Sequence, residues 1–153
     1  RDTDRSRGLG DVYKRQKMIY VTDNCGEVVC DKLAVEELKK GFPGLDITVM
    51  VRGEAALNDA TIEDALQTGL DKAARITDNG CGVAGTPLDY VGADARRLLE
   101  EADVIVAKGQ GNFETMHGCG LNIYYSFLCK CDWFRKRFGM EKNKGMFVRE
   151  RSS

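Results

Sequence analysis

The sequence predicts an α/β protein whose strands form a mainly parallel sheet. Three short apolar runs, at 18–22, 47–51 and 104–107, are typical of buried strands. The segments 27–40 and 93–102 instead place their apolar residues on one helical face. Strands with near-continuous apolar runs that alternate with helices indicate βαβ units, in which helices cover a parallel sheet.

The rest of the chain gives shorter signals for secondary structure. A short helix is expected from residue 62 and a short strand at 74–77. The apolar segment 122–131 fits a buried helix or a buried strand, because its periodicity does not distinguish the two. The tail, 133–149, mixes basic and aromatic residues, and we expect a surface helix followed by an edge strand at 145–148.

Size and charge restrict the class of protein. A chain of 153 residues suits one domain with a sizeable core. A formal net charge of −1 gives no electrostatic attraction toward nucleic acid or a membrane surface. No apolar run approaches the ~20 residues of a membrane span, and the charged N-terminus lacks the apolar segment of a signal peptide. We therefore expect a cytoplasmic protein without nucleic-acid or membrane partners; its oligomeric state is left open.

Residues 1–17 differ from the rest of the chain. They are polar, rich in basic residues and without periodicity. They resemble an adaptor-derived leader, and we expect them to be unstructured and non-native. The domain is then expected at 18–150, truncated on its N-terminal side.

The six cysteines, at positions 25, 30, 81, 119, 129 and 131, favour a reducing compartment. Their spacing does not form the paired CxxC pattern of a zinc ribbon. We expect most of them to be buried free thiols, because cysteine behaves as a small hydrophobic residue.

Polar side chains follow the first two predicted strands. Asp23 and Asn24 come directly after the first strand, and Glu27 begins the helix. A helix-capping role would explain only one of the two adjacent residues. Asp59 follows the second strand, and a right-handed crossover makes the two strand ends neighbours. Ligands of open α/β folds bind at this edge, so we predict that Asp23, Asn24 and Asp59 share one cation.

The predicted donors favour phosphate chemistry. Oxygen ligands without His or Cys select a hard or borderline divalent ion such as Mg²⁺ or Mn²⁺. The third apolar strand ends at Lys108, followed by Gly109 and Gly111, which allow close backbone approach. Lys108 and Arg52 would offset the negative charge of a phosphoryl group. These residues predict hydrolysis of a phosphate monoester, with a metal that activates water.

Two other motifs do not support alternative sites. Gly80, Gly82 and Gly85 match the dinucleotide-binding spacing, but Pro87 would break the helix that this fingerprint requires. His117 is the only histidine, so a triad or a His-rich metal site is excluded. We expect it at a helix end or in a loop, without a residue that orients it.

Four motifs, in the same order along the chain, resemble the damage-control phosphatase family, and the resemblance covers about residues 18–150. This family was long catalogued as a domain of unknown function and includes a protein described as an acidic-residue methyltransferase. The motifs are VTDNCGE at 21–27, RG and NDxT within 52–61, GTPLD at 85–89 and KGQGNxE at 108–114.

The resemblance implies a three-layer α/β/α sandwich with a Rossmann-like sheet, without the helical N-terminal region of the family. It also implies a divalent metal (Mn²⁺, Mg²⁺, Ni²⁺ or Co²⁺) held by Asp23, Asn24 and Asp59, with Lys108 on the substrate phosphate. The implied substrates are small phosphorylated metabolites, such as damaged or excess sugar phosphates or cofactor intermediates.

The remaining roles are hypotheses. Glu27 would orient a ligand or act as a base, Asn112 would assist Lys108, and Arg52 and Thr86 would shape the substrate site. An aspartyl-phosphate mechanism is disfavoured, because Cys25 stands where a second aspartate is needed. Two alternatives remain open: an S-adenosylmethionine-dependent carboxyl methyltransferase, and a non-catalytic domain that binds phosphometabolites.

Overall fold

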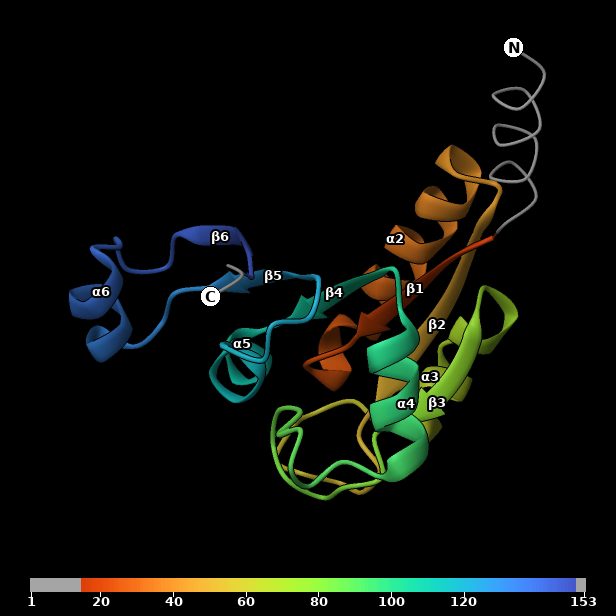
Figure 1. The fold of residues 1–153 in the computed structure, drawn as a ribbon, viewed down its shortest axis with the longest axis horizontal. Helices are drawn as coiled ribbons and strands as arrows, with labels where there is room; N and C mark the ends of the chain where they lie inside the picture. The colour runs from red at the N-terminus through yellow and green to blue at the C-terminus, as the bar shows by residue number, and fades with distance from the viewer. Residues whose placement is uncertain (1–14, 151–153) are drawn as a thin grey trace, which may run out of the picture.

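The computed structural model describes residues 15–150, which form one sheet with helices on both of its faces (Figure 1). The elements in chain order are β1 (Gln16–Val21), η1 (Cys25–Glu27, a 3₁₀ turn), α2 (Val28–Gly41), β2 (Leu45–Val51), α3 (Ile62–Gln67), η2 (Leu70–Lys72, a 3₁₀ turn), β3 (Arg75–Asp78), α4 (Ala93–Glu101), β4 (Val104–Lys108), α5 (Gln110–Met116), β5 (Ile123–Leu128), α6 (Asp132–Phe138) and β6 (Gly145–Arg149).

The sheet has six strands in the order β3-β2-β1-β4-β5-β6. The first five are parallel, and β6 pairs antiparallel with β5. The chain therefore proceeds outward from β1 to β3 and then returns to the other side of β1 at β4. In such sheets the crevice at the point of reversal is the usual ligand site, and here it lies between the carboxyl ends of β1 and β4.

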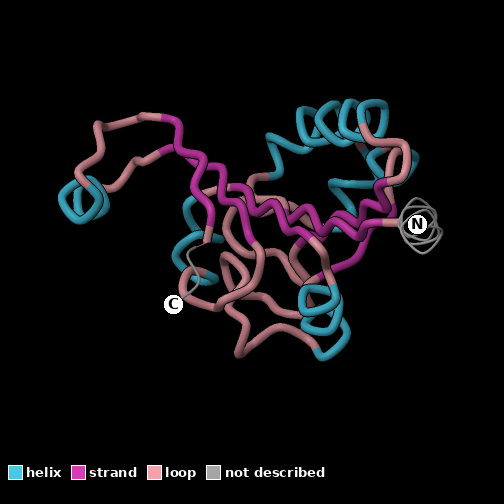
Figure 2. The backbone as a smooth tube through the Cα atoms, turned by 45° about the horizontal axis from the view of Figure 1, so that its top comes forward, coloured by secondary structure: helices cyan, strands magenta, loops and turns pink. Residues whose placement is uncertain are grey.

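Helices α2 and α3 cover one face of the sheet, and α4 and α5 cover the other (Figure 2). The core under α2 and α3 includes Val28, Val35 and Ala65. The core on the opposite face includes Leu99 of α4 and Phe113 of α5. The predicted three-layer α/β/α sandwich with a mainly parallel sheet is confirmed.

Most predicted elements are confirmed, and two segments carry new information. Segment 122–131, which fitted a helix or a strand, contains strand β5. Residues 110–116, for which no helix or strand was expected, form the short helix α5. The leader prediction lies largely outside the described residues, although Gln16 and Lys17 already pair with β2.

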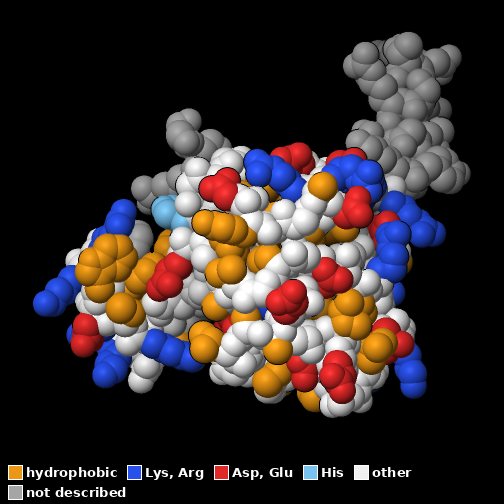
Figure 3. Space-filling model, turned by 90° about the horizontal axis from the view of Figure 1, so that it is seen from below, with side chains coloured by type: hydrophobic (Ala, Val, Ile, Leu, Met, Phe, Trp, Pro, Cys, Tyr) orange, Lys and Arg blue, Asp and Glu red, His pale blue; other side chains and the backbone are white. Residues whose placement is uncertain are grey.

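The surface carries no large field of one sign on the face shown in Figure 3, where acidic and basic side chains are interspersed with apolar ones. Within residues 15–150, no helix is both long and apolar enough to cross a bilayer. All six cysteines are free. Cys81 and Cys129 are buried as predicted, but the prediction was wrong for Cys25 and Cys30, which are exposed because their segment faces solvent at the helix start.

Candidate active site

The loops that follow β1 and β2 are joined through their backbones at the carboxyl edge of the sheet. Asn24 and Asp59 form an isolated antiparallel bridge. The amide of Ala60 donates to the carbonyl of Asp23 at 2.7 Å. Asp23, Asn24 and Asp59, which lie far apart in the sequence, are thereby brought together, as the position of the two strand ends predicted.

Negative charge accumulates at this edge. Burial raises the pKa of Asp23, and the neighbouring carboxylates of Asp59 and Glu27 raise it further, while Arg52 and Lys108 act in the opposite direction. Within residues 15–150, the Asp23 carboxylate has no hydrogen-bond donor in the structure. A carboxylate in these surroundings would gain from a bound cation.

The oxygen donors fit a divalent ion with open coordination positions. Asp59 uses its Oδ2 for protein contacts, with Arg52 Nε at 2.6 Å and Gly85 N at 3.1 Å, which leaves Oδ1 for a ligand. The Oδ1 of Asn24 accepts from Gly26 N at 2.8 Å and retains a second lone pair. The described residues contain no cluster of three or more His, Cys, Asp or Glu side chains placed for a metal. A cation here would therefore have two carboxylates and one amide, with water and substrate completing its shell.

Gly109 allows the end of β4 to approach Asp23 closely. Its φ is +84°, and a Cβ added at this position would lie 2.1 Å from Cγ of Asp23. Only glycine combines this conformation with this approach. The glycine predicted for close backbone approach therefore borders the carboxylate itself.

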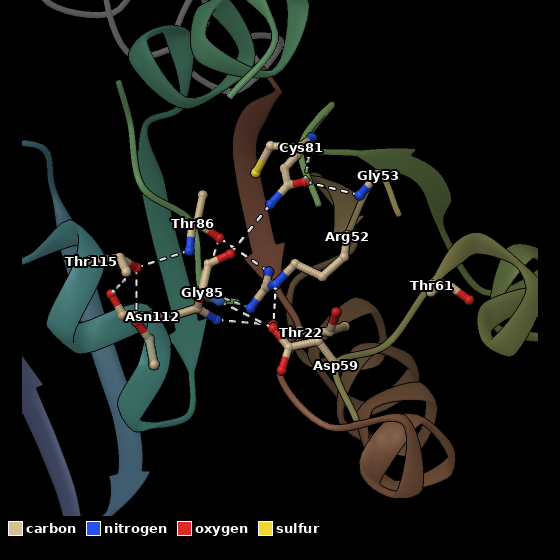
Figure 4. A network of polar contacts seen from close by, with 12 residues as sticks. Thr22, Arg52, Gly53, Asp59, Thr61, Cys81, Gly85, Thr86, Asn112 and Thr115 are labelled. Atoms are coloured by element: carbon tan, nitrogen blue, oxygen red, sulfur yellow. Dashed lines mark hydrogen bonds and ion pairs between the residues drawn. The ribbon is translucent and has the colours of Figure 1, made fainter. Parts of the chain in front are cut away.

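A buried polar network holds the Asp59 carboxylate at its Oδ2 atom (Figure 4). The Arg52 side chain is fully buried, and its Nε donates to Asp59 Oδ2 at 2.6 Å. Its Nη1 donates to Thr86 Oγ1 at 3.1 Å and its Nη2 to Asn112 Oδ1 at 3.0 Å. Asn112 also donates through Nδ2 to the carbonyl of Thr22 at 2.9 Å. The network thus links the loops after β2 and β3 to α5 and β1.

Arg52, Thr86 and Asn112 were expected to contact substrate, and direct contact stays a prediction. Each of these residues is at most 1% exposed, and their polar groups face one another and Asp59. A guanidinium has five N–H donors in a fixed planar arrangement, which suits it to hold several acceptors at once. The observed contacts orient Asp59.

Lys108 contacts two carboxylates, one just before helix α2 and one in the first turn of that helix. Its Nζ lies 3.1 Å from Glu27 Oε2 and 3.2 Å from Asp31 Oδ1. Burial lowers the pKa of Lys108, but the charges of Asp31 and Glu27 outweigh burial and raise it overall. The ammonium group therefore stays protonated at neutral pH. Asp31 was not predicted as a site residue; the signal for it was its position four residues after Glu27, on the same helix face as buried Val28 and Val35.

A cavity of about 600 Å³ opens beside these groups. One end is lined by Asp23, Glu27, Lys108 and Gly109, and the other by residues of β5, β6 and their connection, including Lys130. Its size is within the usual range for small-molecule sites. The cavity can therefore hold a small molecule whose anionic group contacts Lys108.

The two motifs set aside from the sequence lie elsewhere. No helix follows the glycines of 80–85 until Ala93, so the dinucleotide fingerprint lacks its helix. Asn79 instead holds this loop, accepting from Gly53 N at 2.9 Å. His117 caps the C-terminal end of α5, as predicted. The prediction that it has no partner was wrong, because Glu150, distant in sequence, places Oε2 at 3.4 Å from its Nδ1.

Comparison with known proteins gives one consistent group of relatives. The family model described as "Damage-control phosphatase ARMT1-like domain" matches residues 3–145. A damage-control phosphatase of Archaeoglobus fulgidus is 38% identical over 141 residues, which are 91% of this chain and 47% of the relative. A damage-control phosphatase of Pyrococcus horikoshii is 33% identical over 130 residues, 84% of this chain and 45% of the relative. The crystal structure of a DUF89 family protein from the same organism superposes with a TM-score of 0.84 at 28% identity, covering 95% of this chain and 51% of that one. The chain thus spans about half the length of these relatives.

Proposed function

Because the chain belongs to the damage-control phosphatase ARMT1-like family, we propose that it hydrolyses phosphate monoesters of small metabolites with the help of a divalent metal ion. One observation carries the proposal. Asp23 and a protonated Lys108 line the cavity at the crevice where the strand order reverses, and the backbone joins Asp23 and Asn24 to the loop that carries Asp59. Damaged or excess sugar phosphates and cofactor intermediates are the proposed substrate class, in keeping with the name of the family.

Asp23, Asn24 and Asp59 would hold the metal, which is Mn²⁺, Mg²⁺, Ni²⁺ or Co²⁺ in this proposal. When bound, such an ion supplies positive charge to the phosphoryl oxygens and lowers the pKa of water. Arg52 keeps the Asp59 carboxylate in position through the 2.6 Å contact at Oδ2, and this contact also fixes the direction of the Oδ1 atom.

The side chains of the protein have separate tasks in the proposed reaction. Lys108 binds a phosphate oxygen, since its charge is maintained by the neighbouring carboxylates. The water oxygen attacks phosphorus and gives up one proton, the bond from phosphorus to the ester oxygen breaks, and that oxygen takes a proton from solvent and leaves as the alcohol. Glu27, which lines the cavity, is the candidate to accept the proton of the water or to orient a ligand.

The proposal is tested by phosphate release from p-nitrophenyl phosphate in the presence of each metal ion. We expect metal-stimulated turnover in the wild-type protein and its loss in Asp23→Ala and Asp59→Ala. Asp46→Ala is the matched control, because its carboxylate pairs with Arg75 at the opposite end of the strands. Full activity in both site variants would contradict the proposal. If the wild-type protein is active, a panel of phosphorylated metabolites would define its substrate.

A further inference from the structure

A buried carboxylate lies next to Lys108, and the proposed reaction does not use it. Asp31 is 1% exposed. Its Oδ1 accepts from the Tyr20 hydroxyl at 2.7 Å and from Lys108 Nζ at 3.2 Å. Its Oδ2 is buried without a hydrogen-bond partner among the described residues. A buried carboxylate with an unpartnered oxygen is unfavourable, so stability alone does not account for the arrangement.

Three elements place these groups together. Tyr20 lies on β1 and Lys108 ends β4, and these strands are neighbours in the sheet. Tyr20 belongs to the core beneath α2, so its hydroxyl meets the helix face that carries Asp31. Glu27 lies four residues earlier, just before α2. The ammonium of Lys108 is therefore held by one buried and one exposed carboxylate.

The two carboxylates differ in how firmly they hold Lys108. The side chain of Asp31 is 1% exposed, whereas that of Glu27 is 47% exposed. Charge interactions are stronger where water is excluded, and solvent screens those at the surface. A phosphate that enters the cavity competes with exposed Glu27, while buried Asp31 keeps its contact.

We propose that Asp31, itself held by Tyr20, is a positioning residue that keeps the Lys108 ammonium in place to bind the phosphate of the substrate. This inference rests on the proposed function, because it assigns Lys108 to phosphate. An ammonium has three N–H donors, and the contacts with Asp31 and Glu27 use two of them. A lysine held in this way loses less conformational freedom when phosphate binds.

The direct test measures the affinity for inorganic phosphate by calorimetry and the KM and kcat for p-nitrophenyl phosphate, both with Mn²⁺. We expect Asp31→Asn to weaken phosphate binding about 10- to 100-fold, as for loss of a hydrogen bond between charged groups. Tyr20→Phe keeps the ring and should weaken binding about 3- to 10-fold. In both variants the change should appear mainly in KM.

Tyr125→Phe is the matched control. The Tyr125 hydroxyl is buried and donates to Glu150 Oε2 at 2.8 Å, so this substitution also removes a contact between a tyrosine and a buried carboxylate. It lies in the core on the other face of the sheet, and we expect unchanged phosphate affinity. Circular dichroism and urea unfolding identify any variant that fails to fold.

A double-mutant cycle tests whether Asp31 acts through Lys108. In a Lys108→Met background, Asp31→Asn should cause no further loss of phosphate affinity. A further loss of the same size, or unchanged affinity in both Asp31→Asn and Tyr20→Phe, would overturn the inference.

Acetylation of Lys108 by acetic anhydride, followed by mass spectrometry, separates this inference from the proposed function. We expect faster acetylation in Asp31→Asn and Tyr20→Phe than in the wild type and Tyr125→Phe. If this occurs in a protein that does not bind phosphate, Lys108 is positioned as inferred but the phosphate role fails. Unchanged acetylation in both variants contradicts positioning, whatever the phosphate result.

Discussion

Replacing Gly109 by alanine should disable the site through a single added methyl group. The new Cβ would lie 2.1 Å from Cγ of Asp23, whereas ordinary carbon contacts need about 3.5 Å. Asp23 or the junction of β4 with α5 must therefore move by more than about 1 Å. A displacement of that size at a reacting centre costs about 100-fold in rate. The φ of +84° adds about 1–3 kcal/mol of backbone strain for a residue with a side chain.

The assay compares kcat/KM for p-nitrophenyl phosphate and the thermal midpoint of unfolding in Gly109→Ala and Gly118→Ala. Gly118 has a φ of +90°, and a methyl group added there would have no atom within 4 Å, so it reports the strain without the clash. We expect both variants to lose stability and only Gly109→Ala to lose about 100-fold in kcat/KM. Equal activity in the two variants would refute the argument that Gly109 is required for the position of Asp23.

Three further predictions concern the buried groups. Arg52→Met leaves the Asp59 carboxylate without its buried partner and should lower the free energy of unfolding by about 3–5 kcal/mol, measured by urea denaturation. Arg52→Lys keeps the charge but loses the planar donor set, so we expect a large fall in kcat and only a small fall in the free energy of unfolding. Activity equal to that of the wild type would contradict the orienting role of Arg52. Burial and the carboxylates of Asp31 and Glu150 raise the pKa of Tyr20 and Tyr125. Folded protein therefore holds these protons above the unfolded pKa of about 10, and its stability should fall as pH rises beyond that value. Absorbance at 295 nm should show that these phenols ionise only on unfolding, and early titration in the folded state would contradict this.

The sequence was informative where a local pattern and a general rule of sheet topology acted together. Apolar runs located the strands, and the edge rule placed Asp23, Asn24 and Asp59 at adjacent loops. Segment 122–131 could not be assigned, because a strand buried in a sheet and a buried helix segment are both uniformly apolar. Helix α5 was missed because Gly109 and Gly111 indicate a loop and no capping side chain marks the start of the helix.

The roles of individual side chains depended on tertiary contacts that no short motif contains. From the sequence alone, Arg52 is interpreted as a cation free to bind a ligand. The structure shows that its N–H groups donate to Thr86 and Asn112 inside the protein. Asp31 reads as an exposed helix residue until Tyr20 and Lys108 are seen to cover it. In both cases the partners lie on other elements of the fold, so spacing along the chain does not identify them.

The most direct test of the central claim is a calorimetric titration of the metal-free protein with Mn²⁺. We predict one divalent site per chain in the wild type and in Asp46→Ala, and its loss in Asp23→Ala and in Asp59→Ala, with weaker binding in Asn24→Ala. Unchanged Mn²⁺ affinity in both aspartate variants would contradict the assignment of a shared cation to the crevice between β1 and β4.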